Sequence, residues 1–216
     1  MAENYFIDQD HVLQYFRDTN ALLEGHFQLS SGLHSTQYLQ CALALQYPAD
    51  AARFGRAIAE QLVNSLEAVA LSAGAGNAPL EIDAVAAPAI GGLIIGYAVA
   101  QAMNKRFIWT ERQGGEMTLR RGFAIKPGER LVVVEDVITT GGSTRECIAA
   151  LEENGGRVIA GASIIDRSDG LADVGVPRIS LVSLDVPSFS EAECPMCAAG
   201  TPAIKPGSRG TLSRPA

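Results

Sequence analysis

The chain has 216 residues, of which 47% are hydrophobic and 19% charged, with a net charge of −7 and a pI of about 5.0. This length allows one domain with a full core plus a small accessory element, and the composition argues against long disorder. A general nucleic-acid binder usually carries a basic face, so we expect no nucleic-acid partner. Residues 1–10 lack an apolar signal core and no run reaches 18 apolar residues, so we expect a cytoplasmic protein outside the membrane.

The N-terminal segment, residues 1–45, is expected to form a helix and a small cap. Val12, Leu13 and Phe16 lie on one face of a helix over residues 10–19. The stretch 25–35 is polar and rich in turn residues, which predicts a short hairpin or a loop-rich cap. His11, His26 and His34 stand isolated along the chain, and we assign none of them a catalytic role.

Strands and helices alternate in the middle segment, residues 46–187. Pro48 opens a long helix to about Glu67, and residues 71–79 form a loop. The following expected elements are strands at 82–87, 106–110, 131–135, 157–165 and 179–184, with helices at 91–103 and 143–154. This alternation predicts an α/β fold with a parallel sheet flanked by helices.

One stretch, residues 131–143, contains the residues that most clearly indicate a ligand-binding site. Four apolar residues suit a strand buried on both faces, and Glu135 and Asp136 follow at once. The next residues are Val137, Ile138, Thr139, Thr140, Gly141, Gly142 and Ser143. They lead into a helix, where Ser143 and Glu146 have the spacing of a capping box.

This order of residues predicts a site with two parts. A loop between the carboxyl end of a strand and the start of a helix offers free N–H groups that attract a phosphate. Glu135 and Asp136 would repel that phosphate, so we expect them to accept hydrogen bonds from the hydroxyls of a ribose. No lysine follows the glycines, so the loop is not a Walker A motif.

These residues resemble the signature of the type I phosphoribosyltransferases, which bind phosphoribosyl pyrophosphate (PRPP). The resemblance implies a parallel sheet flanked by helices with a small N-terminal hood. It also implies that Glu135 and Asp136 hold the ribose, that residues 137–143 hold the 5-phosphate, and that Arg112 and Asp136 are the catalytic residues. Mg²⁺ is the implied cofactor, held through PRPP rather than by a direct side-chain ligand.

Four further features resemble the orotate phosphoribosyltransferases, over roughly residues 22–187. Residues 25–35 are similar to the hood that covers the base, although many members carry lysine where this chain has Ser30. The turn made of Pro88, Ala89, Ile90, Gly91 and Gly92 is similar to the pyrophosphate loop. Gly91 stands near a position that is often lysine, so backbone amides must contribute more there.

The remaining two features concern the loop 110–122 and the end of a strand. The loop is similar to a mobile catalytic loop that reaches the partner's site in a homodimer, with Arg112 as the best match to a PRPP contact. Glu116 occupies a position that is often basic in relatives. Arg167 matches the residue that binds the carboxylate of orotate, and Thr139 would also contact the base. The implied reaction joins PRPP and orotate to give orotidine 5′-monophosphate and pyrophosphate.

The last segment, residues 188–216, is an expected tail or surface strap that contains Cys194-Pro-Met-Cys197. The pair has metal or redox spacing, and a similar tail occurs in one branch of the family. A structural zinc site needs four ligands, and a second such pair is missing from the sequence. Cys41, Cys147, a histidine or a symmetry mate could complete a site through folding; plain reduced thiols are the favoured interpretation.

Other functions remain as alternatives. A transferase for uracil or a purine would lack a use for Arg167, because those bases carry no carboxylate. A PRPP-sensing regulator that binds nucleic acid should show a basic face, and a structural partner with a dead site should have lost the acidic pair.

Overall fold

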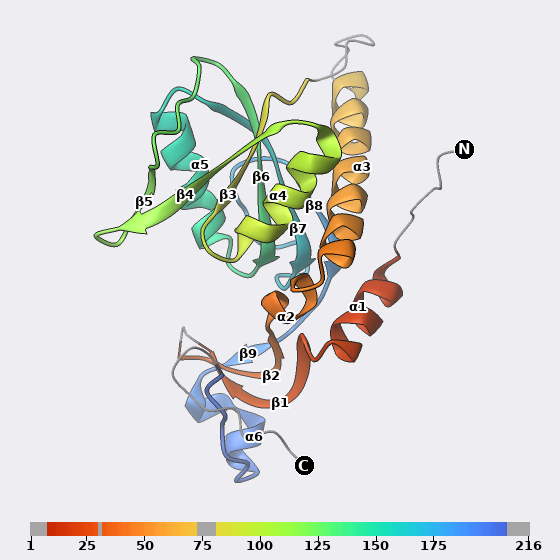
Figure 1. The fold of residues 1–216 in the computed structure, drawn as a ribbon. Coiled ribbons are helices and arrows are strands. Elements are labelled where there is room, and N and C mark those ends of the chain that lie inside the picture. Colours follow the sequence, from red (N-terminus) through yellow and green to blue (C-terminus); the bar gives the residue numbers. More distant parts are fainter. Residues whose placement is uncertain (1–7, 30–31, 73–80, 207–216) are drawn as a thin grey trace.

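The computed structural model describes residues 8–29, 32–72 and 81–206 of the chain, and it contains two sheets. Figure 1 shows the larger sheet with its helices above the smaller one. Ser30, Ser31, most of the expected loop 71–79 and residues 207–216 lie outside the described residues. No helix among the described residues is long and apolar enough to span a membrane.

The larger sheet has six strands in the order β5-β4-β3-β6-β7-β8. Neighbouring strands are parallel except for β5, which pairs antiparallel with β4. The parallel α/β fold predicted from the alternation of elements is therefore confirmed. The strands are β3 (Ala84–Pro88), β4 (Arg106–Gln113), β5 (Glu116–Leu119), β6 (Arg130–Ile138), β7 (Arg157–Asp166) and β8 (Arg178–Ser183).

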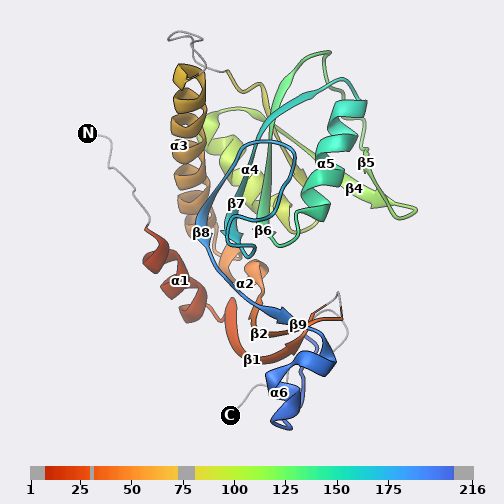
Figure 2. The same ribbon diagram turned by 180° about the vertical axis from the view of Figure 1, so that it is seen from behind.

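Helices cover both faces of this sheet, because the side chains of a strand point alternately to its two sides. Val132 and Val134 of β6 belong to a core with α1, α3 and α4, whereas Leu131 and Val133 pack with α5 on the opposite face. Figure 2 shows α3 and α5 on opposite sides of the sheet. The helices are α1 (Gln9–Asp18), α3 (Pro48–Ser72), α4 (Gly92–Met103) and α5 (Gly142–Glu153).

Three elements are longer than the sequence predicted. Helix α3 continues past Glu67 to Ser72, so residues 71 and 72 of the expected loop are helical. Strand β6 continues past the apolar run through both acids to Ile138, so Glu135 and Asp136 lie within the strand. Strand β4 continues to Gln113 and turns at Gly114 and Gly115 into β5. The stretch expected as a polar loop is therefore a β-hairpin, which projects from the edge of the sheet (Figure 1).

The smaller sheet, which we call the hood, combines strands from the N-terminal and C-terminal parts of the described chain. Strands β1 (Leu22–Gln28) and β2 (His34–Leu39) form an antiparallel hairpin, and β9 (Ser188–Phe189) pairs with β2. Further along the chain, Ile204 lies at the other edge of β1. Its backbone N–H donates to the carbonyl of His26, and its carbonyl accepts from the N–H of Gln28. The remaining short helices are α2 (Cys41–Leu45), η1 (Glu191–Glu193) and α6 (Pro195–Ala198).

Candidate active site

The order of strands gathers the predicted motifs at one edge of the large sheet. Strands β4, β3, β6 and β7 are consecutive neighbours and run parallel, so their carboxyl ends meet there. Arg112, the turn 88–92, the acidic pair and Arg167 each belong to the end of one of these strands. Ligands of open α/β sheets bind at such an edge.

The loop after β6 forms the wall of a cavity of about 220 Å³. Gly141 is the N-cap of α5 with a φ of +74°, and an added Cβ would lie 2.8 Å from Cγ1 of Val174, so glycine is required there. The helix makes no side-chain cap hydrogen bond, so the predicted capping box is wrong. The lining residues are Arg112, Glu135, Val137, Ile138, Thr139, Thr140, Gly141, Gly142, Ser143, Thr144 and Glu146.

The geometry of this loop suits a phosphate. The first-turn N–H groups of a helix lack partners within the helix and carry its positive dipole end. The hydroxyl-bearing residues Thr139, Thr140 and Ser143 are exposed around it. Arg145 braces the loop from outside, since its Nη1 donates to the carbonyl of Thr140 at 2.9 Å.

Of the acidic pair, Glu135 lines the same cavity, whereas Asp136 lies next to it on β6 and faces Gly91. Glu135 is buried, and its Oε2 has no hydrogen-bond partner among the described residues. Burial, and then the nearby charge of Asp136, raises the pKa of Glu135 well above its usual range. Burial also raises the pKa of Asp136, whose Oδ1 accepts from the N–H of Val137 at 2.8 Å. Such carboxylates gain from hydroxyl donors or a cation, so their chemistry fits a ribose diol with Mg²⁺ nearby.

The turn 88–92 lies against the acidic pair. A Cβ on Gly91 would stand 2.7 Å from Oδ1 of Asp136, and one on Gly92 would stand 2.9 Å from Oε2 of Glu135. Glycine therefore allows the turn to approach both carboxylates. Ala89 already donates its N–H to the carbonyl of Thr110, and Pro88 has none. Ile90, Gly91 and Gly92 remain as the amide donors that this turn offers to a ligand.

The β4–β5 hairpin contributes one arginine to the cavity. Arg112 lines it from a position near the tip of the hairpin, where it pairs with Met117; it donates to the carbonyl of Gly115 at 2.7 Å and forms an ion pair with Glu146. Arg120 and Arg121 instead pair with Glu111, at 3.2 and 2.9 Å. Arg112 is thus the arginine of this hairpin placed beside the phosphate loop of its own chain. The tip with Glu116 projects away from the sheet (Figure 1).

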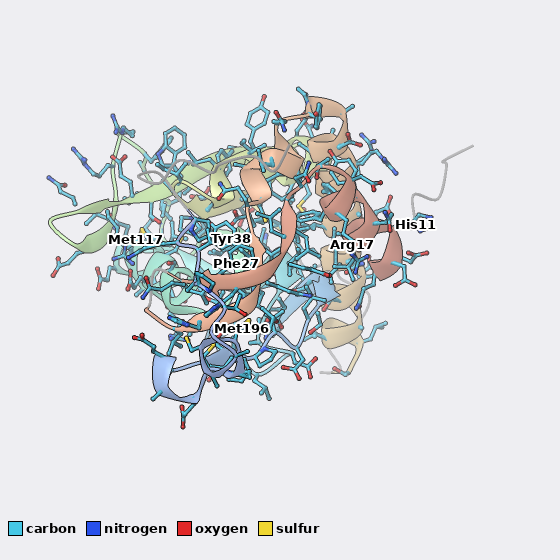
Figure 3. The ribbon with its side chains drawn as sticks, turned by 90° about the horizontal axis from the view of Figure 1, so that it is seen from below. His11, Arg17, Phe27, Tyr38, Met117 and Met196 are labelled. Atoms are coloured by element: carbon cyan, nitrogen blue, oxygen red, sulfur yellow. The ribbon has the colours of Figure 1, made fainter. Side chains whose placement is uncertain are left out.

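A second cavity, of about 440 Å³, lies between the large sheet and the hood. It shares Thr139 and Thr140 with the first cavity, so the two adjoin. Leu29, Leu33, Tyr38, Arg167, Val186 and Ser188 complete its lining. In Figure 3 Tyr38 lies beside Phe27 of the hood, and their ring centroids are 5.8 Å apart.

Arg167 is the cation of this second cavity. Its Nη2 donates to Oγ of Ser35 at 3.2 Å, while its buried Nε has no partner among the described residues. Burial lowers the pKa of the guanidinium, although at neutral pH it stays charged. A half-buried fork of donors with one buried, unmet N–H is suited to an anionic group of a ligand.

Comparison with known proteins agrees with this geometry. The family model described as phosphoribosyl transferase domain matches residues 56–193. The orotate phosphoribosyltransferase of Heliobacterium modesticaldum is 49% identical over 94% of this chain and the whole of that relative. The chain belongs to the orotate phosphoribosyltransferases. The enzyme of that name from Caldicellulosiruptor bescii is 46% identical over 94% of this chain and 99% of its own length.

A solved orotate phosphoribosyltransferase, from Aeropyrum pernix, shares the fold. It superposes with a TM-score of 0.62 at 25% identity, covering 80% of this chain and 93% of that structure. The predicted resemblance, the enzyme class and the type I phosphoribosyltransferase fold are therefore confirmed.

Proposed function

We propose that the chain transfers ribose 5-phosphate from PRPP to orotate, giving orotidine 5′-monophosphate and pyrophosphate for pyrimidine synthesis. One observation carries the proposal: the phosphate-loop cavity and the Arg167 cavity adjoin at Thr139 and Thr140. A nucleotide could therefore extend from a phosphate at the helix start to a carboxylate-bearing base at Arg167. Membership of the orotate phosphoribosyltransferase family supports this assignment.

The PRPP half of the site divides into three contacts. The amides and hydroxyls of residues 137–143 would hold the 5-phosphate. Glu135 and Asp136 would accept hydrogen bonds from the ribose hydroxyls, which offsets the cost of their burial. Arg112 and the amides of residues 90–92 would bind the pyrophosphate, with Arg112 exchanging its ion pair with Glu146 for the ligand.

Catalysis then follows from the charge that develops during transfer. As the bond to pyrophosphate breaks, negative charge grows on the leaving group and positive charge on the ribose, where Arg112 and the carboxylate of Asp136 stabilise them. Mg²⁺, when bound with PRPP, supplies further charge to the pyrophosphate. The hood would limit access of water to the ribosyl cation.

Orotate would occupy the cavity under the hood. Its carboxylate would bind the guanidinium of Arg167, and Thr139 would contact the ring, so that a ring nitrogen faces the ribose. The chain itself then needs no covalent nucleophile. Uracil and purines carry no such carboxylate, which would leave Arg167 unpaired.

The assembly and location are also part of the proposal. The projecting β4–β5 hairpin is shaped to reach a second copy, so we expect a homodimer in which its tip approaches the partner's site. None of the four cysteines, all among the described residues, forms a disulfide, which fits a cytoplasmic enzyme. The net charge of −7 argues against a nucleic-acid partner.

The test is turnover of a panel of bases. The protein is incubated with Mg²⁺ and PRPP plus orotate, uracil, adenine or hypoxanthine, and loss of each base is followed. Consumption of orotate alone, with pyrophosphate released in equal amount, is the expected result. Consumption of another base in place of orotate would overturn the assignment. Binding of PRPP without turnover of any base would favour the regulator instead.

A further inference from the structure

A cluster of four potential metal ligands lies in the hood, away from the catalytic edge. His26 comes from β1 and His34 from β2, while Cys194 and Cys197 flank the start of α6. Nε2 of His26, Nδ1 of His34 and the two Sγ atoms all lie within 4.8 Å of one another. Residues more than 160 positions apart are thus gathered around one point.

The distances between these atoms are close to those around a tetrahedral zinc ion. Nε2 of His26 lies 3.5 Å from Sγ of Cys194 and 3.7 Å from Sγ of Cys197, and Nδ1 of His34 lies 3.2 Å from Sγ of Cys197. Zinc bonds of about 2.3 Å to sulfur and about 2.0–2.1 Å to nitrogen at tetrahedral angles separate N from S by roughly 3.6 Å. The two nitrogens, at 2.8 Å, would separate by about half an ångström more around such an ion.

The protonation of His26 also suits a ligand. Its Nδ1 lies 2.7 Å from the carbonyl oxygen of Thr201, which can only accept a hydrogen bond. Nδ1 therefore carries the proton, and the lone pair of Nε2 faces His34 and the two sulfurs. A backbone carbonyl that fixes the tautomer in this way is the usual second partner of a metal-bound histidine.

Burial indicates a structural rather than a catalytic ion. His26, His34 and Cys194 are 4%, 3% and 1% exposed. Two sulfurs and two imidazoles fill all four positions of a tetrahedron, which leaves no open site for water or substrate. A Cys-x-x-Cys pair in an enzyme of a reducing compartment is more often metal-binding than a disulfide.

We propose that His26, His34, Cys194 and Cys197 bind one structural Zn²⁺ that fastens the C-terminal segment to the hood. The hood needs such a fastening, because it has three strands and β9 contributes only two residues. Bonds from the zinc to Cys194 and Cys197 attach the residues after β9 to the histidines of β1 and β2.

The ion also acts on the base cavity, by which we mean the second cavity, where orotate would bind beside Arg167. This effect rests on the proposed function. His34 precedes Ser35, whose Oγ accepts a hydrogen bond from Arg167, and it follows Leu33, which lines the same cavity. Zinc thereby positions β2 against the orotate-binding arginine. His34 is a positioning residue in this respect, and the zinc content tests the metal site independently of any turnover.

The experiment measures metal content in the purified full chain, prepared without chelator and with no added tag that binds metal. Elemental analysis is expected to find about one zinc per chain in the native protein. In the double variant Cys194→Ser with Cys197→Ser it is expected to fall below about a tenth of that. His11→Asn is the matched control, since His11 lies on α1 away from the hood (Figure 3) and should leave the zinc content unchanged.

A second measurement uses the native chain and so does not depend on a variant that folds. Titration with an organomercurial that blocks thiols should release zinc to a colorimetric indicator in step with modification of two cysteines. Replacement of zinc by Co²⁺ should give the visible bands of a tetrahedral ion and a sulfur charge-transfer band. Metal-free native protein, a Cys194–Cys197 disulfide, iron in place of zinc, or zinc retained by the double variant would each overturn the proposal.

The link to the base cavity has its own readout. Chelator-stripped protein should show a raised KM for orotate, with KM for PRPP little changed, and added zinc should restore the original value. An unchanged KM for orotate in zinc-free, folded protein would overturn the positioning role of His34. Absence of turnover with all bases in zinc-loaded protein would instead count against the proposed function.

Discussion

Replacement of Arg167 by glutamine should remove most of the preference for orotate. Among the described residues, the guanidinium of Arg167 has a hydrogen bond to Oγ of Ser35, at 3.2 Å, and its buried Nε has none. Its guanidinium is therefore available for two charge-assisted bonds to a carboxylate. Each such bond is worth roughly 1.5–3 kcal/mol. Because Arg167 is only half-buried, we take about 3 kcal/mol for the pair, which corresponds to about a hundredfold in kcat/KM for orotate.

The assay is steady-state consumption of orotate at saturating PRPP and Mg²⁺. In Arg167→Gln, kcat/KM for orotate should fall about a hundredfold, while KM for PRPP changes little. Arg157→Gln is the control, because Arg157 is exposed at the opposite end of the same strand. A loss below about threefold in Arg167→Gln, or an equal rise in KM for PRPP, would refute the role assigned to Arg167.

Three further predictions concern carboxylates and a glycine. Asp136→Asn should lower kcat/KM for PRPP about a hundredfold. In the native enzyme KM for PRPP should rise as the pH falls through the raised pKa of Asp136, since the ionised form accepts the ribose hydroxyls. A KM for PRPP with the same acid dependence in Asp136→Asn as in the native enzyme would contradict this. Gly91→Ala should raise KM for PRPP tenfold or more, a loss of roughly 1–3 kcal/mol of binding free energy, because the added Cβ would meet Asp136. Gly161→Ala is the control and should leave KM unchanged, because its Cβ would meet nothing nearer than 3.5 Å. Asp166→Asn should lower the free energy of unfolding, measured by urea denaturation, by about 3 kcal/mol, because it breaks a buried ion pair with Arg178. An unchanged urea midpoint would contradict this.

The stability contributed by Asp166 should depend on pH in a defined direction. Burial alone would raise the pKa of this carboxyl, but hydrogen bonds from Ser168, Arg178 and Gly170 outweigh it and lower the pKa below its usual value. A group with a lowered folded pKa stabilises the fold above its unfolded pKa, and this contribution is lost as the pH falls through the folded pKa. Asp166→Asn should therefore flatten the acid side of the stability curve.

The sequence predicted the strand ends that meet at this edge of the sheet, because their determinants are local. The apolar run of β6, the acids and the glycines that follow lie in one stretch, and a parallel sheet then places neighbouring strand ends together. The error at the start of α5 has a tertiary cause. Glu146 forms an ion pair with Arg112 of the hairpin, and Gly141 caps the helix through its left-handed backbone.

The hood was predicted only in part, because its contacts join distant segments. The hairpin of β1 and β2 was predicted from the turn-rich stretch 25–35, but β9 has two residues and is a strand because it pairs with β2. Likewise His26 and His34 look isolated in sequence, and their approach depends on the register of β1 and β2. The Cys-Pro-Met-Cys stretch was the one signal that pointed to the cluster, and the two partner histidines had no local signature.

The most direct test of the proposed function is a crystal structure with orotidine 5′-monophosphate bound. We expect the 5-phosphate on the amides of residues 140–143, the ribose hydroxyls on Glu135 and Asp136, and the carboxylate of the base on Arg167. A nucleotide bound with its base away from Arg167, or with its phosphate outside the loop after β6, would contradict it.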